Sequence, residues 1–157
     1  MTPTNLLGKT EARPVLRLTR RFDAPREAVF RAWTDAAALA TWFGPEGVKT
    51  RQVVSDPRPG GRFSLEMYES DGVYPVSGVY REVTPPERLV VSWIWGNGEL
   101  EGLETAVTIE LRETDGGTEL TLTHEGLPTD IARDKHEGGW VSSFDCLERF
   151  LADGRPQ

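Results

Sequence analysis

Cysteine and histidine, which supply most zinc ligands in small domains, are nearly absent from this sequence of 157 residues. Cys146 is the only cysteine, so the chain can form neither an intramolecular disulfide nor a cysteine-based metal site. The two histidines, His124 and His136, do not combine with Cys146 in a zinc-binding spacing. No Gly-x-Ser-x-Gly string marks a hydrolase nucleophile, and the glycine-rich strings at 44–47 and 95–102 lack the strand–loop–helix context of a nucleotide site. We therefore expect neither a metal nor a cofactor.

Basic residues are also scarce relative to acidic ones, with 18 Lys and Arg against 25 Asp and Glu and a net charge of −7. Nucleic acids and anionic membrane surfaces attract clustered Lys and Arg, so neither is an expected partner. No apolar run approaches the roughly 20 residues that span a bilayer, and residues 1–13 lack the apolar core of a signal peptide. These observations predict a cytoplasmic protein with a flexible tail over 1–13, one domain over 14–152 and a short tail over 153–157.

Large aromatic side chains are plentiful, with five Trp, six Phe and three Tyr. Each can bury roughly 150–250 Å² on folding, which indicates a wide, ring-lined interior. Alternation of apolar and polar residues, interrupted by Gly, Asp and Pro, predicts an opening strand and a meander of six more. Because the connections are short, neighbouring strands are expected to pair in antiparallel fashion. The predicted strands cover 15–22, 52–56, 62–67, 75–84, 89–95, 105–112 and 119–124.

Helical spacing occurs twice in the chain. Pro25 and Asp35 are typical helix-start residues, and each precedes a short apolar segment, which predicts two short helices after the first strand. A long helix is predicted from about Asp130 to Ala152, where Trp140, Phe144, Leu147 and Leu151 form one apolar stripe. A helix of this length extends ~30 Å, which is enough to cross the whole sheet.

A resemblance to a known family rests on six strings in the same order along the chain. These are FDAPREAVFRAWTD (22–35), WFGP (42–45), DPRPGGRF (56–63), GVYREVTPPERLVVSW (78–93), LTLTHEGLP (120–128) and GGW (138–140). Over residues 14–152 the chain resembles bacterial homologues of the activator of the heat-shock-protein-ninety ATPase, within the START-like (SRPBCC) superfamily. The resemblance implies an α+β helix-grip (START/Bet v-like) fold, in which a curved sheet of six to seven antiparallel strands wraps the C-terminal helix. It also implies a cavity between sheet and helix, which different superfamily members use for sterols, lipids, aromatic polyketides or drugs.

The residues expected to line this cavity are those that strand alternation and the helix stripe place on inward faces. Tyr80 and His124 would be its polar groups, and His124 could also act as a general base. The alternative is that these side chains fill the core and that His124 is hydrogen-bonded to a neighbouring element. His136 is expected to be exposed, and Cys146 half-buried. The predicted lining residues are Trp33, Phe43, Phe63, Leu65, Met67, Tyr80, Val91, Trp93, Trp95, Val107, Ile109, His124, Trp140 and Phe144.

The function that these features favour is the binding of a small apolar molecule, lipid-like or aromatic, without catalysis. One alternative is an enzyme of the cyclase, hydratase or hydrolase type that uses His124, Tyr80 or an inward carboxylate such as Glu66 or Glu82. Another is a protein-interaction module, including a co-chaperone-like one, although no motif supports a protein partner. We expect a monomer or a weak dimer.

Overall fold

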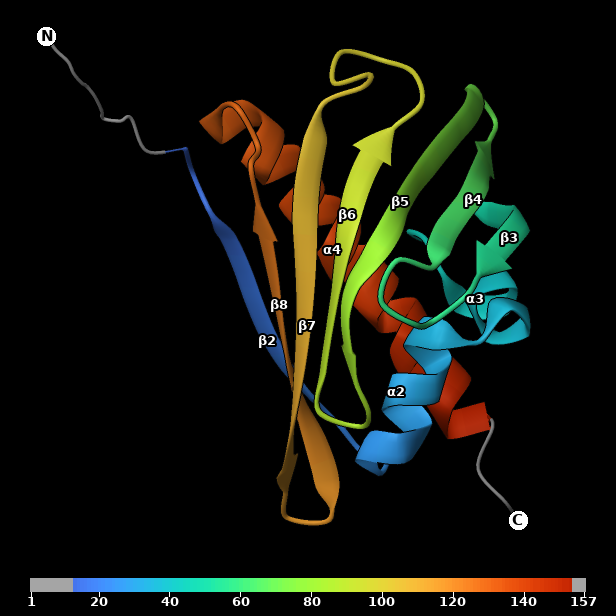
Figure 1. Cartoon of the computed structure of the whole chain (residues 1–157). Coiled ribbons are helices and arrows are strands. Elements are labelled where there is room, and N and C mark those ends of the chain that lie inside the picture. The colour runs from blue at the N-terminus through green and yellow to red at the C-terminus, as the bar shows by residue number, and fades with distance from the viewer. Residues whose placement is uncertain (1–12, 154–157) are drawn as a thin grey trace, which may run out of the picture.

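The computed structural model describes residues 13–153, so most of the two predicted tails lies outside the described residues. A single antiparallel sheet has the strand order β2-β8-β7-β6-β5-β4-β3, and one long helix crosses one of its faces (Figure 1). The elements in chain order are β2 (Leu16–Phe22), α2 (Arg26–Thr34), α3 (Ala36–Trp42), β3 (Lys49–Ser55), β4 (Arg62–Glu69), β5 (Gly72–Thr84), β6 (Arg88–Trp95), β7 (Glu104–Thr114), β8 (Gly117–Glu125) and α4 (Asp130–Asp153).

The two short helices begin and end near the predicted residues. The Asp35 side chain accepts a hydrogen bond from the backbone N–H of Ala38 at 2.9 Å, which satisfies one of the free donors at the start of α3. Pro25 precedes α2, although no side chain caps that helix. The indole N–H of Trp42 donates to the carbonyl oxygen of Ala32 at 2.8 Å, which fixes α3 against α2.

The strands confirm the predicted alternation, with one correction at β3. That strand begins at Lys49, three residues before the predicted start at Gln52. The alternation is interrupted there, because Gln52 has a φ of +56° and lies in a β-bulge opposite β4. A second bulge lies in β5 between Tyr80 and Glu82. Neither bulge reverses the inward faces of β4, β6, β7 and β8, whose predicted apolar residues are buried except for Trp95, which is half-buried.

The long helix buries the predicted stripe of Trp140, Phe144, Leu147 and Leu151. Figure 1 shows α4 running obliquely across the sheet, and α2 and α3 also pack against α4. The core therefore lies between the inward face of the sheet and the three helices, as in a helix-grip fold.

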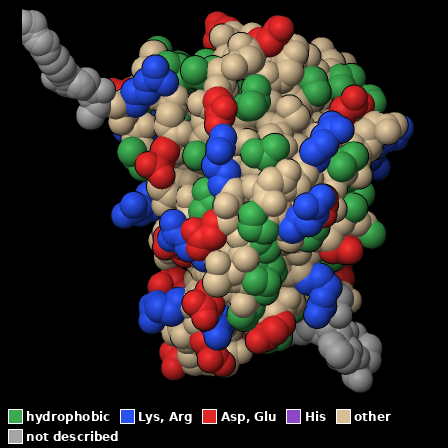
Figure 2. Space-filling view, in the orientation of Figure 1, with side chains coloured by type: hydrophobic (Ala, Val, Ile, Leu, Met, Phe, Trp, Pro, Cys, Tyr) green, Lys and Arg blue, Asp and Glu red, His purple; other side chains and the backbone are tan. Residues whose placement is uncertain are grey.

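Charged side chains of both signs are interspersed over the face seen in Figure 2. Ion pairs link neighbouring strands, such as Arg88 with Glu110 at 2.6 Å and Arg112 with Glu119 at 2.8 Å. Such exposed pairs contribute little stability each. Within residues 13–153, no helix is both long enough and apolar enough to cross a membrane.

Candidate functional site

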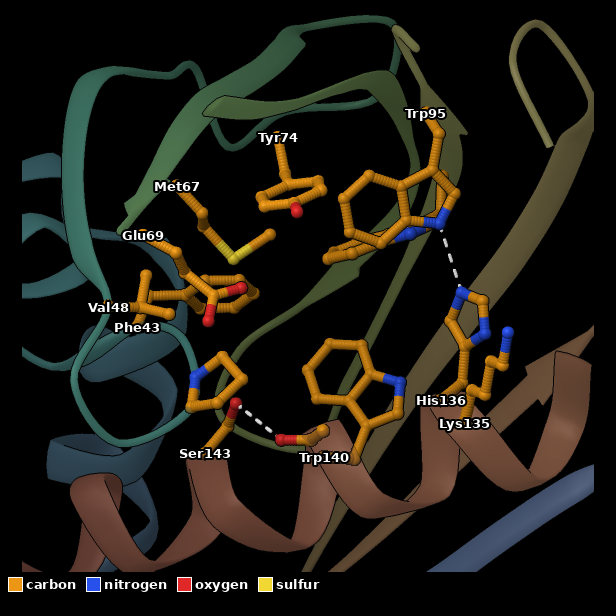
Figure 3. Close-up of a pocket in the computed structure, with 13 residues that line it drawn as sticks. Phe43, Val48, Met67, Glu69, Tyr74, Trp95, Lys135, His136, Trp140 and Ser143 are labelled. Atoms are coloured by element: carbon orange, nitrogen blue, oxygen red, sulfur yellow. Dashed lines mark hydrogen bonds between the residues drawn. The ribbon is translucent and has the colours of Figure 1, made fainter. Parts of the chain in front are cut away.

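A pocket of about 510 Å³ lies between the inward face of the sheet and the first half of α4 (Figure 3). The segment that follows α3 closes one side through Phe43, Pro45 and Val48. Glu69 and Lys135 are exposed side chains that line the pocket, and they place its mouth at this end of the sheet. The lining residues are Phe43, Pro45, Val48, Met67, Glu69, Tyr74, Trp93, Trp95, Lys135, His136, Gly139, Trp140 and Ser143.

The deep wall of the pocket consists of aromatic rings from β6, from α4 and from the segment that follows α3. Trp93 of β6 lies with its ring centroid 5.2 Å from that of Trp140 of α4 and 6.0 Å from that of Phe43. Trp95 meets Trp93 edge-to-face at 5.5 Å. Such edge-to-face and tilted arrangements are the favoured geometries of aromatic pairs, so the rings hold one another in place. The wall is therefore formed before any ligand arrives.

His136 belongs to this pocket, which corrects the expectation that it would be exposed. It is half-buried, and its Nε2 atom accepts a hydrogen bond from the indole N–H of Trp95 at 3.0 Å (Figure 3). Its Nδ1 atom donates to the carbonyl oxygen of Ala132 at 2.8 Å, which fixes the neutral tautomer. Polar residues surround His136 in the sequence, and only the packing of α4 against β6 turns its ring inward.

His124 is fully buried and lies behind the pocket wall, as predicted from the alternation of inward and outward side chains in β8. Its Nδ1 atom accepts from the indole N–H of Trp140 at 3.2 Å, and its Nε2 atom bonds the hydroxyl of Thr105 at 2.8 Å. The Thr105 hydroxyl also donates to the carbonyl oxygen of Trp93. Both nitrogens of His124 are thus occupied, and the structure supports the core-histidine alternative over a general base.

Burial lowers the pKa of His124 from 6.5 to about 3, with a smaller contribution from the nearby His136. Between these two values the unfolded chain binds a proton that the folded chain does not, so the stabilisation is complete above pH 6.5 and is lost as the pH falls toward 3. From pH 7 to pH 5 this residue alone is expected to lower the free energy of unfolding by about 2 kcal/mol. Burial also lowers the pKa of His136, which acts in the same direction.

Urea unfolding at pH 7, 6 and 5 measures this loss of stability. The range lies above the ordinary pKa values of most carboxyl groups, so their titration contributes little to the change. The control is His124→Gln, which keeps one donor and one acceptor but does not titrate. Its stability should fall much less over the same range. Equal slopes in the two proteins would show that His124 is not the titrating group.

The structure separates the fourteen predicted lining residues into two groups. Five of them line the pocket: Phe43, Met67, Trp93, Trp95 and Trp140. The other nine lie in the packed interior outside it, because side chains from the opposite layer fill the space beneath them. These are Trp33, Phe63, Leu65, Tyr80, Val91, Val107, Ile109, His124 and Phe144.

The remaining polar candidates also lie outside the pocket. The Tyr80 hydroxyl forms a hydrogen bond of 2.6 Å with that of Ser55, and burial raises the pKa of Tyr80. Glu66 accepts a hydrogen bond from Tyr68 at 2.7 Å on the opposite face of β4, and Glu82 pairs with Arg88. Neither carboxylate converges with His124.

Eight lining residues were not predicted from the sequence, although strand alternation or helical spacing indicated an inward position for some of them. Glu69 continues the inward parity of Phe63, Leu65 and Met67, and His136 and Ser143 lie one helical turn to either side of Trp140. The loop residues offered no such periodicity. The missed residues are Pro45, Val48, Glu69, Tyr74, Lys135, His136, Gly139 and Ser143. Over residues 13–153, no group of three or more His, Cys, Asp or Glu side chains could hold a metal ion.

A curved antiparallel sheet that packs around a long C-terminal helix, with an open pocket between the two, defines a helix-grip domain of the START-like class. The chain belongs to the family described as Activator of Hsp90 ATPase homolog 1-like protein, whose model matches residues 23–152. The resemblance noted in the sequence is thereby confirmed. Membership supports a ligand-binding fold and specifies no ligand.

Solved structures agree with this assignment. The chain is 33% identical to an AHSA1 protein from Silicibacter pomeroyi, with a TM-score of 0.80 over 90% of this chain and 100% of the other. It is 30% identical to a protein from Chromobacterium violaceum, with a TM-score of 0.80 over 88% and 98% of the two chains. A protein from Rhodobacter sphaeroides shows 26% identity and a TM-score of 0.77 over 90% and 95%. No curated protein matches the chain.

Proposed function

We propose that this protein binds a small apolar molecule, aromatic or lipid-like, in the pocket between the sheet and α4. The observation that carries the proposal is the unfilled volume of about 510 Å³ beside Trp93, Trp95 and Trp140. Binding sites for small molecules usually enclose about 300–1,000 Å³ and are lined mainly by apolar and aromatic side chains. A folded domain ordinarily packs such rings against one another without a space of this size.

The energetics also favour an apolar occupant. Each Å² of apolar surface that leaves water contributes roughly 25 cal/mol, and the rings offer flat surfaces on several sides of the space. Because the rings already contact one another, little side-chain freedom remains to be lost on binding. A rigid, preformed wall therefore favours a ring-containing guest over a flexible polar one.

The enzymatic and protein-interaction alternatives gain less support from the geometry. Both histidines have their ring nitrogens engaged, and no carboxylate or guanidinium group among the described residues hydrogen-bonds His124. The exposed large apolar side chains are spread over β3, β5, α4 and the segment before β2, which does not indicate a docking face for a protein. These side chains are Val15, Val54, Val73, Ile131 and Val141.

Two neighbouring glycines of α4 allow a matched test of the pocket. A Cβ atom added at Gly139 would meet only Pro45, at an ordinary contact distance of 3.9 Å, and the rest of a leucine side chain would occupy the pocket. A Cβ added at Gly138 would meet nothing within 4 Å, and this residue is exposed. Both Gly→Leu changes raise helix propensity by a similar amount, so the two variants differ mainly in where the side chain lies.

The neutral dye N-phenyl-1-naphthylamine, which fluoresces strongly in apolar surroundings, serves as the probe. Gly139→Leu is expected to weaken its binding by about ten-fold or more, whereas Gly138→Leu should bind it like the unchanged protein. Circular dichroism checks that both variants keep the fold. Equal dye binding by all three proteins, or no binding by any, would contradict a ligand site in this pocket.

A further inference from the structure

The hydrogen-bond donors of the pocket are already engaged within the protein. The indole N–H of Trp95 donates to His136, and the Nδ1–H of His136 donates to Ala132. The Ser143 hydroxyl donates to the carbonyl oxygen of Gly139 at 2.8 Å. A ligand that needs donors from these side chains would have to break an existing bond.

The other lining donors follow the same pattern. The Tyr74 hydroxyl donates to the Asp71 carboxylate at 2.8 Å, and the indole N–H of Trp140 donates to His124. The indole nitrogen of Trp93 has no partner among the described residues, but it has no accessible surface either. The side chain of Lys135 is the exception, because its ammonium group has no hydrogen-bond or ion-pair partner within residues 13–153 and retains its donors.

What remains free inside the pocket is the capacity to accept hydrogen bonds. The Glu69 carboxylate has no hydrogen-bond or ion-pair partner within residues 13–153, and a carboxylate can only accept. The hydroxyl oxygens of Tyr74 and Ser143 each keep a lone pair. Figure 3 shows the Glu69 carboxylate directed into the pocket from β4, on the opposite side from Lys135 and His136.

We infer that the occupant is an apolar, ring-containing molecule with a protonated amine, whose ammonium group binds Glu69 while its apolar part lies against Trp93, Trp95 and Trp140. This inference rests on the proposed function and adds the chemical class of the ligand. Five aromatic rings line the pocket, and the faces of Trp and Tyr rings attract organic cations. The net charge of −7 also favours a cationic ligand over an anionic one at long range.

The ammonium group of Lys135 would favour an anionic ligand instead. Its position makes it a weaker determinant of ligand charge than Glu69. Strand alternation directs Glu69 inward, on the face of Phe63, Leu65 and Met67, and the position is held by the sheet. Lys135 is an exposed residue in the second turn of α4 with a long flexible stem, so its ammonium group can remain in water. An amine ligand can therefore bind without contact with Lys135.

Three probes that share a naphthalene ring test the inference: 1-naphthylmethylamine, 1-naphthalenemethanol and 1-naphthoic acid. Their affinities are measured by isothermal titration calorimetry at pH 7 and low salt. The amine is expected to bind about ten-fold more tightly than the acid, because a partly exposed ion pair and ring–cation contacts add to the shared apolar burial. Added salt should reduce this preference, since the contact lies near the mouth.

Two charge-neutralising variants on one strand separate a local effect from a general one. Glu69→Gln should abolish most of the preference for the amine, whereas Glu66→Gln, on the opposite face of β4, should retain it. Lys135→Met should strengthen amine binding, because a like charge is removed.

Each other outcome has a distinct meaning. Tightest binding of the acid, lost in Lys135→Met, would overturn the inference in favour of an anionic ligand. Equal affinity of the amine and the alcohol in both the unchanged protein and Glu69→Gln would overturn it while leaving the proposed pocket function intact. Binding of none of the three probes, together with no binding of the neutral dye, would overturn both.

Discussion

Replacement of Phe144 by alanine is expected to lower the free energy of unfolding by about 3–5 kcal/mol. The side chain is 2% exposed, meets Phe22 edge-to-face at 5.9 Å and lies 5.5 Å from the guanidinium carbon of Arg20. It joins α4 to β2, and its removal leaves a cavity between two elements that the rest of the core holds apart. Urea or guanidinium unfolding, followed by tryptophan fluorescence, measures the change.

Val141→Ala is the matched control on the same helix. Val141 is 39% exposed, so its truncation should change the free energy of unfolding by no more than about 0.5 kcal/mol. Because Phe144 does not line the pocket, folded Phe144→Ala should still bind the neutral dye. A loss of dye binding without a loss of stability would place Phe144 in the ligand site and not in the core.

Gly78→Ala is also expected to destabilise the protein strongly, lowering the free energy of unfolding by about 3 kcal/mol or more. A Cβ atom built on Gly78 would lie 1.8 Å from the backbone carbonyl oxygen of Ser92, so β5 and β6 would have to separate there. The Ser92 hydroxyl also accepts a hydrogen bond from the backbone N–H of Val79 at 2.8 Å, which such a separation would break. Since Trp93 follows Ser92, the change should also disturb the pocket wall.

Gly138→Ala provides the comparison for the same change in chemistry. Its Cβ atom would meet nothing within 4 Å, and alanine is the better helix former by about 1 kcal/mol, so this variant should be as stable as the unchanged protein or more so. Thermal unfolding of the two variants side by side gives the difference. If Gly78→Ala were as stable as Gly138→Ala, the close approach of β5 to β6 at Ser92 would be incorrect.

The inward faces of the strands and of α4 could be predicted from the sequence because side-chain direction is a local property. Alternation in β6 places Trp93 and Trp95 on one face, and the spacing of Trp140, Phe144 and Leu147 places them on one side of a helix. Turn residues such as Gly116 set the short connections between strands. The start of β3 could not be predicted, because the bulge at Gln52 interrupts the alternation there.

The site was predicted less completely than the fold. Alternation shows that Val107 and Trp93 both point inward, but it does not show which of them faces an empty space. His136 illustrates the same limit, since its ring turns inward only where Trp95 offers an indole N–H from another element. Glu69 shows the same limit, because strand alternation directs its charged side chain toward the inward face of β4. The carboxylate avoids the cost of burial only because this position lies at the open mouth of the pocket.

The sequence by itself determined the order of the elements, the antiparallel sheet, the single long helix and the faces that each turns toward the core. The tertiary structure decided where the core is packed solid and where it leaves a pocket, and which polar groups keep free hydrogen-bonding capacity. The physical reason is that periodicity is a property of neighbouring residues, whereas the pocket depends on contacts among distant ones. Phe43, Met67, Trp93 and Trp140 come together only when three separate parts of the fold are in place.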